Sequence, residues 1–167
     1  IIVKYSPSGT HFFFFFFFMH NSNKIDYAYD LKLDASGNVF VTGRGTNSSG
    51  NADIFTAKLN NSGVVQWKKA YNGAANKDDS GVALVLASNG NSVFVTGSTT
   101  NASNNKDIIV IAYNAATGAE NWKKVVTGTA NSNDVPTAIV LSGANIVFTG
   151  QVDNTTTGKD CITMKMA

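Results

Sequence analysis

Two segments of this 167-residue chain recur at a nearly fixed interval, and this repetition constrains the fold more than any other feature. One segment is an apolar stretch that ends in Val-Thr-Gly or Phe-Thr-Gly, and its copies occupy residues 26–43, 79–97 and, more loosely, 134–150. The other is an apolar run that begins with Asp53, Asp107 or Asp160, which are 54 and 53 positions apart. A unit of this size cannot bury its own apolar face, so neighbouring units must stack.

Four short apolar runs in each unit indicate a β-propeller, in which every unit is a four-stranded antiparallel blade. The chain is predicted to be all-β, because Asn, Gly, Ser and Thr interrupt every window that an amphipathic helix would need. Residues 108–113 are apolar throughout, which predicts that both faces of this strand are covered. Stacked blades cover both faces without helices.

The whole chain, 1–167, is predicted to be part of one propeller. Residues 26–72 and 79–127 are expected to be complete blades, whereas residues 1–20 supply a third and a fourth strand and residues 134–167 supply the first three strands of a blade. Because the chain starts and stops within expected strands and lacks an initiator Met, it is expected to be a fragment of a longer protein. A ring needs about four to eight blades, so the remaining ones must come from the rest of that protein or from neighbouring copies.

One stretch departs from the pattern. Where a fourth strand similar to residues 65–71 is expected, residues 11–20 read His, seven Phe, Met and His. A membrane span needs about 20 apolar residues, so the run is too short to be one. A native outer strand should alternate apolar and polar residues, and an unbroken apolar edge invites aggregation. We therefore interpret Phe12–Phe18 as letters that do not represent the native residues, and assign no function to residues 11–20.

Residues 31–43 read Leu-Lys-Leu-Asp-Ala-Ser-Gly-Asn-Val-Phe-Val-Thr-Gly, and residues 53–58 read Asp-Ile-Phe-Thr-Ala-Lys. Together they resemble the bacterial SBBP-type β-propeller repeat, whose pattern is Asp-x-x-Gly-Asn-x-aromatic-Val-Thr-Gly, a loop, and Asp-x-Phe/Ile-x-x-Lys. The likeness covers the chain apart from the Phe run and is weakest at residues 142–150. It implies a non-enzymatic structural, adhesion or ligand-binding module of a larger secreted or cell-surface bacterial protein.

A second likeness is narrower. Residues 112–122, Ala-Tyr-Asn-Ala-Ala-Thr-Gly-Ala-Glu-Asn-Trp, are similar to the tryptophan-docking motif of quinoprotein propellers, and residues 60–67 hold a version one residue shorter. The motif implies that Trp67 and Trp122 lock neighbouring blades together. One alternative function is therefore a quinoprotein-like oxidoreductase, although no cofactor-binding residue is recognisable and no cofactor is predicted. The other is a carbohydrate-binding, lectin-like propeller, if either Trp can stack on a sugar.

No catalytic, cofactor-binding or metal-binding residue is predicted, and an enzymatic activity is not favoured. Both His residues lie in the 11–20 stretch, so no other His is available for acid–base chemistry or for zinc. Carboxylates repeated in every blade could form a ring around a cation. A repeated residue more simply serves the repeat, by accepting hydrogen bonds from backbone N–H groups in its own turn. The same reasoning makes the following repeat positions structural: Trp67, Trp122, Asp53, Asp107, Asp160, Gly43, Gly97 and Gly150.

Cys161 stands where the other units carry Ile54 and Ile108, and it is predicted to be a small core residue. The net charge of +2 and the scattered Lys and Arg residues argue against a nucleic-acid partner. The expected partners are the remainder of a longer chain or neighbouring subunits, and a glycan or protein ligand. The loops expected to present such a ligand site on one face are residues 46–52, 99–106 and 152–159.

Overall fold

The computed structural model describes the backbone of residues 2–5, 7–9, 11–14 and 26–167, and the side chains of residues 7–9 and 26–167. These residues form 13 β-strands and no helix. Every paired strand runs antiparallel to its neighbour, and every pair joins strands that follow one another along the chain. The prediction of an all-β antiparallel chain is confirmed.

Three larger sheets follow a two-stranded ladder of β1 (Ile2–Tyr5) and β2 (His11–Phe14). The first contains β3 (Asp26–Leu33), β4 (Val39–Thr46), β5 (Ala52–Leu59) and β6 (Val65–Tyr71). The second contains β7 (Ser80–Leu86), β8 (Ser92–Thr100), β9 (Lys106–Asn114) and β10 (Glu120–Val126). The third contains β11 (Val135–Ser142), β12 (Asn145–Asn154) and β13 (Gly158–Met166).

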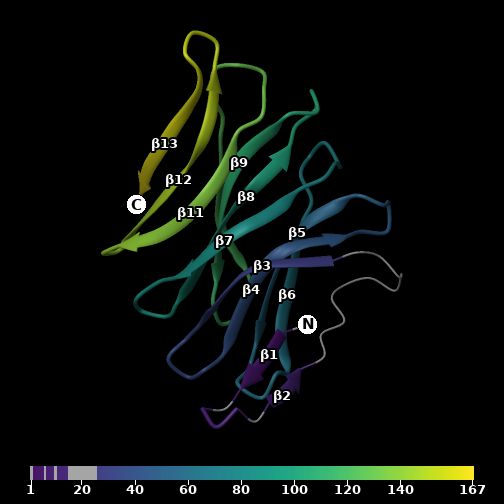
Figure 1. Ribbon diagram of the computed structural model, residues 1–167, viewed down its shortest axis with the longest axis vertical. Coiled ribbons are helices and arrows are strands. Elements are labelled where there is room, and N and C mark those ends of the chain that lie inside the picture. The colour runs from purple at the N-terminus through teal and green to yellow at the C-terminus, as the bar shows by residue number, and fades with distance from the viewer. Residues whose placement is uncertain (1, 6, 10, 15–25) are drawn as a thin grey trace.

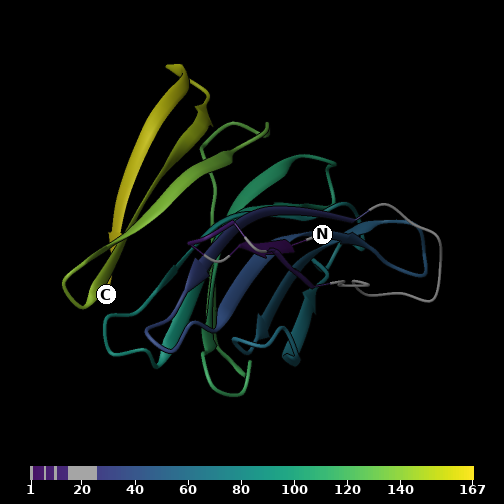
Figure 2. The same cartoon turned by 60° about the horizontal axis from the view of Figure 1, so that its bottom comes forward.

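The three larger sheets lie one after another, from blue through green to yellow, and the strand ladders of the described residues do not close into a ring or barrel (Figure 1). The first strand of each later sheet packs against the sheet before it, because β7 contacts β3, β4 and β5, and β11 contacts β7, β8 and β9. Figure 2 shows the same succession of sheets from a second direction. The arrangement is therefore an open array of stacked antiparallel sheets.

Short polar turns connect the strands, and their chemistry is local. In the β3–β4 turn, one carboxylate oxygen of Asp34 accepts hydrogen bonds from the backbone N–H groups of Ser36 and Asn38, each at 2.9 Å. Gly37 completes the turn with a φ of 76°, a backbone conformation that glycine adopts without steric cost. This explains why an Asp-x-x-Gly-Asn sequence forms a tight connection here.

The second and third strands are longer than the apolar pattern predicts. Strand β4 continues past Gly43 to Thr46, and its last residue pairs with Ala52 of β5. The backbone ladder continues through polar residues because its hydrogen bonds do not depend on the side chain. The predicted loop at 46–52 is therefore shorter in the structure than in the prediction.

A β-bulge in the first strand of each larger sheet lies opposite a glycine of the second strand. The register shifts just beyond the pairs Ala28–Gly43, Gly81–Gly97 and Pro136–Gly150. A Cβ on Gly97 would overlap the carbonyl oxygen of Ser80, and the glycines at 43 and 150 face equivalent overlaps. Only glycine lets the bulged backbone approach this closely, which explains its repetition.

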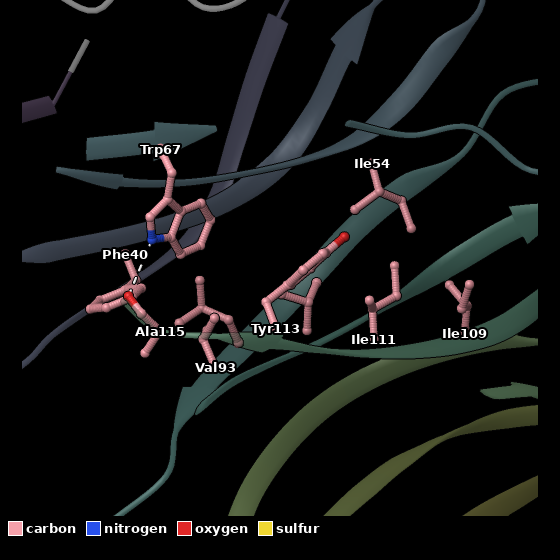
Figure 3. Packing of buried hydrophobic residues seen from close by; sticks show 10 residues of the cluster. Phe40, Ile54, Trp67, Val93, Ile109, Ile111, Tyr113 and Ala115 are labelled. Atoms are coloured by element: carbon pink, nitrogen blue, oxygen red, sulfur yellow. Dashed lines mark hydrogen bonds between the residues drawn. The ribbon is translucent and has the colours of Figure 1, made fainter. Parts of the chain in front are cut away.

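Two apolar layers separate the larger sheets. Between the first and second sheets, Phe40, Ile54 and Trp67 pack against a row of β9 side chains that includes Tyr113 (Figure 3). Between the second and third sheets, Ile108 and Val110 pack against buried side chains of β11 and β12. Each residue from 108 to 113 is at most 3% exposed, which confirms that both faces of β9 are covered.

Cys161 differs from its prediction. It is exposed on β13, whereas Ile54 and Ile108 at the equivalent positions are 0% exposed. The two isoleucines are buried because the following sheet covers them, and among the described residues no sheet follows the third one. The prediction of a core cysteine is therefore wrong for this structure.

The Phe run is described only in part. The backbone of residues 12–14 belongs to β2 and pairs with residues 2–4 of β1. Residues 15–20, and with them the rest of the run, lie outside the described residues. The interpretation that these letters are not native stays a prediction.

Candidate functional site: the loop end of the sheets

The aspartates that open the third strands are each paired with an asparagine of the preceding loop. Asn47 donates its amide N–H to Asp53 at 2.9 Å, and Asn101 donates to Asp107 at 3.0 Å. In the third sheet Asp160 accepts the same hydrogen bond at 2.7 Å, from the asparagine at position 154. The prediction was that backbone N–H groups of the same turn would donate to these carboxylates. In the structure each carboxylate does bond within its own turn, but the donor that all three share is an asparagine side chain.

These three aspartates do not converge on a common point. Among residues 26–167, no group of three or more His, Cys, Asp or Glu side chains is arranged to hold a metal ion. Burial raises the pKa of Asp107, and its bond to Asn101 offsets part of that rise. The bonds from Thr157 and Asn154 instead lower the pKa of Asp160. The local surroundings, rather than a shared ion, therefore account for both carboxylates.

The aspartates that precede the first strands hold the sheets together. Asp79 is 1% exposed, and its two oxygens accept the backbone N–H groups of Gly73, at 2.5 Å, and Thr100, at 2.9 Å. Asp134, also 1% exposed, makes the equivalent bonds to Gly128 and Asp153 at 2.6 and 2.7 Å. Each carboxylate thus fixes the linker from the previous sheet to the end of its own second strand.

Burial raises the pKa of Asp79, and the bonds from the backbone N–H groups of Gly73 and Thr100 oppose this rise. A carboxylate enclosed by backbone donors in this way has no open oxygen for a substrate. The arrangement is that of a structural clamp.

Backbone hydrogen bonds connect neighbouring sheets at equivalent positions. The N–H of Asp79 donates to the carbonyl of Ala52, and the N–H of Asp134 donates to the carbonyl of Lys106, both at 2.7 Å. The residue before each of these aspartates makes a second bond to the same partner through its side chain. Asp78 accepts from the N–H of Ala52 at 2.9 Å, and Asn133 accepts from the N–H of Lys106 at 2.8 Å. The same four-atom link therefore joins the first sheet to the second and the second to the third.

Trp67 docks on the next sheet. Its indole Nε1–H donates to the carbonyl of Ala115 at 3.1 Å, a bond drawn as a dashed line in Figure 3, and Lys58 donates to the same oxygen at 3.2 Å. Gly118, with a φ of 70°, lies beneath the indole, where a Cβ would come within 2.7 Å of Cδ2. The indole is 8% exposed, so it packs between sheets and presents no open face to a sugar.

Trp122 is only partly buried. Its ring centroid lies 6.0 Å from that of Phe94, and it packs on the apolar layer between the second and third sheets. It also lines an open cleft of about 470 Å³ together with Lys123, Met164 and Met166. Of the two tryptophans, only this one retains an accessible surface.

A second cleft, of about 420 Å³, opens among the loops at the end of the sheets where Ala52 and Lys106 make their inter-sheet bonds. We call it the polar cleft, and every side chain that lines it is polar or charged. Its residues are Asn51, Asn76, Lys77, Asp78, Thr100, Asn104, Lys106 and Asn133.

None of the predicted structural positions lines the polar cleft. Two of the three predicted loops do contribute to it, at residues 46–52 and 99–106, whereas the loop at 152–159 does not. The linkers between sheets supply the remaining residues, and the sequence reasoning did not consider them as site residues. One signal was available: Asn104 occupies a repeat position at which the first unit carries Gly50.

A scan of this chain against models of protein families found no match, and a search of the curated proteins found no relative.

Proposed function

We propose that this chain is part of a β-propeller that serves as a non-enzymatic structural, adhesion or ligand-binding module of a larger secreted or cell-surface bacterial protein. The observation that carries the proposal is the repeated inter-sheet link, in which Asp79 bonds to Ala52 and Asp134 bonds to Lys106. A link repeated at equivalent positions relates each sheet to the next by a similar rotation. Successive rotations of this kind close into a ring when the number of blades is right.

The use of the acidic residues supports a structural or binding role. The carboxylates of Asp79 and Asp134 are held by backbone N–H groups, and those of Asp53 and Asp107 are held by asparagine amides. A general acid or base needs a carboxyl group that a substrate can reach, and these four aspartates are at most 9% exposed. The repeat therefore uses its aspartates to position strands and linkers.

The exposed face of the first sheet supports a partner that continues the array. Leu31 is 45% exposed, although the equivalent residues Leu84 and Ile139 are 0% and 6% exposed because the preceding sheet covers them. Leu33 and the stacked ring of Tyr29 lie on the same strand and are also exposed, at 60% and 51%. A neighbouring blade, from the remainder of a longer chain or from another subunit, would cover this strip. No helix in the described part of the chain is long and apolar enough to cross a membrane.

Electron microscopy of the protein purified from its native source tests the architecture. A ring of about four to eight blades is expected. A straight or helical stack of sheets would refute the propeller. Limited proteolysis of intact cells tests the location, and it should release peptides from the exposed 101–105 loop; peptides recovered only after lysis would refute a surface role.

A quinoprotein-like oxidoreductase is the second candidate, and the docking of Trp67 on Ala115 and Gly118 favours it. This docking is explained by packing alone, since the indole fills the junction between two sheets. The absorption spectrum of the purified native protein separates the two proposals. A bound quinone chromophore with dye-linked dehydrogenase activity would overturn the non-enzymatic function.

The partly exposed Trp122 favours a third candidate, a lectin-like propeller that stacks a sugar on this ring. Glycan binding that is lost in Trp122→Ala, with the fold intact, would establish it. Unchanged binding in that variant would exclude Trp122 as the sugar platform.

A further inference from the structure

Asn104 holds a backbone conformation that the first repeat assigns to glycine. Its φ is 71°, and the equivalent Gly50 of the first unit has a φ of 98°. Residues with a Cβ occupy this region at a cost, which asparagine tolerates better than most but glycine avoids. Glycine could therefore occupy this turn without that steric cost, yet the second unit has asparagine there.

The side chain retained at this cost lines the polar cleft. The equivalent Gly50 and Thr157 line neither this cleft nor the cleft beside Trp122. Asn76, another residue with a positive φ, at 51°, lines the polar cleft as well. The cleft thus gathers two asparagine residues that hold positive φ values.

The hydrogen bonds of the cleft residues fix some polar atoms and leave others available. Asp78 uses Oδ1 for Ala52 N–H, which leaves Oδ2 as an acceptor, and Asn133 uses Oδ1 for Lys106 N–H, which leaves its amide N–H groups as donors. Within the part of the chain that the structure describes, the Asn104 amide and the Lys106 ammonium make no hydrogen bond or ion pair. The inter-sheet links therefore hold the carboxylate of Asp78 and the amide of Asn133 in place before any ligand arrives.

A ligand that matches this cleft must be rich in groups that both donate and accept hydrogen bonds. Amides, a carboxylate oxygen and a threonine hydroxyl supply both functions, and no apolar side chain lines the cleft. The volume of about 420 Å³ falls within the range of small-molecule sites. Hydroxyl groups of a saccharide have this dual character.

We infer that the polar cleft binds a saccharide of one or two sugar units, with Asn104, Asp78 and Lys106 contacting its hydroxyl groups. This inference rests on the proposed binding function and names the ligand class and the site. It differs from a lectin site on Trp122, which lies in the other cleft.

The test begins with the whole protein on an array of neutral and uronic-acid-containing oligosaccharides. The glycan bound most tightly on the array is then titrated by calorimetry into the wild type, Asn104→Gly and Lys106→Gln. We expect Asn104→Gly to weaken binding by about tenfold, the effect of losing one or two hydrogen bonds. The thermal midpoint of this variant should stay unchanged or rise, since glycine suits a φ of 71°. Lys106→Gln should weaken binding as well, and Lys69→Gln, an exposed lysine on β6, is its matched control.

Three outcomes would overturn the inference: no glycan on the array is bound, both cleft variants bind as tightly as the wild type, or Trp122→Ala abolishes binding while Asn104→Gly retains it. The last outcome would place the sugar on Trp122 instead. A ring seen by electron microscopy together with an empty array would refute this inference alone. The absence of a ring would refute the propeller whatever the array shows.

Discussion

Replacement of Trp67 by alanine should destabilise the protein more than any other single aromatic truncation among residues 26–167. The indole is 8% exposed, and its ring centroid lies 6.0 Å from that of Phe40 and 6.3 Å from that of Tyr113. Trp67→Ala would open a cavity between the first and second sheets. The contacts with Ala115 and Gly118 of the next sheet would be lost with it.

The magnitude follows from the buried area. A buried tryptophan removes about 200 Å² from water, which at about 25 cal/mol per Å² corresponds to about 5 kcal/mol. Measured truncations of buried aromatic residues to alanine cost about 3–5 kcal/mol, because the site relaxes only partly. The carbonyl of Ala115 keeps its bond from Lys58, so the variant leaves no unpaired acceptor there. We therefore expect a loss of about 3–5 kcal/mol in the free energy of unfolding.

Urea unfolding followed by far-ultraviolet circular dichroism measures this loss without relying on tryptophan fluorescence. Trp122→Ala is the matched control, since this tryptophan occupies the equivalent position but is only partly buried. It should cost about 1–2 kcal/mol. A loss below about 1.5 kcal/mol for Trp67→Ala, or a loss no larger than that of the control, would refute docking as the main link between the sheets.

Three further predictions concern the strands and the carboxylates. Gly97→Ala should cost about 1–3 kcal/mol in urea unfolding, because its Cβ would overlap the carbonyl oxygen of Ser80; an unchanged stability would contradict the close approach. Leu84→Ala should cost about 2–5 kcal/mol and Leu31→Ala, at the equivalent but 45% exposed position, less than about 1 kcal/mol, so equal losses would show that Leu31 is covered in solution. Carboxyl NMR titration should place the pKa of Asp79 above 3.8 and that of Asp160 below it. Between its unfolded pKa and the raised folded value, Asp79 keeps a proton that the unfolded chain has lost, so its contribution to stability falls as the pH rises through this window. The contribution of Asp160 is present above the unfolded pKa and is lost as the pH falls through the lowered folded value; the reverse order of the two pKa values would refute the assigned surroundings.

The strands and turns of this protein could be predicted from the sequence because their causes are local. The turn at Asp34 needs only one carboxylate, which accepts hydrogen bonds from the backbone N–H groups two and four residues later, and a glycine three residues later. The apolar run at 108–113 indicates burial on both faces, and each of these residues is at most 3% exposed. The boundaries were less accurate, since backbone pairing continues past Gly43 into polar residues that have no apolar signal.

The structural repeat positions were recognisable, but their partners were not. Recurrence singled out Asp53, Gly97 and Trp67, whereas the groups that explain them lie elsewhere in the chain. The partner of Asp53 is an asparagine amide of its loop, Gly97 faces the bulge beside Ser80, and Trp67 reaches a carbonyl 48 residues away. Such partners emerge only when strands pair and sheets stack.

The sequence by itself determined the period, the all-β class and the position of the strands, because these depend on residue type and spacing along the chain. Only the tertiary structure decided which equivalent residues are buried. Leu31 and Leu84 share a repeat position, yet their exposed fractions are 45% and 0%, and the exposed Cys161 stands where Ile108 is 0% exposed. The polar cleft likewise forms where inter-sheet bonds bring together the loops of the first two sheets and the linkers between sheets. The burial of a residue and the meeting of loops both depend on the neighbouring sheet. The sequence pattern of a repeat is the same whether or not another sheet covers it.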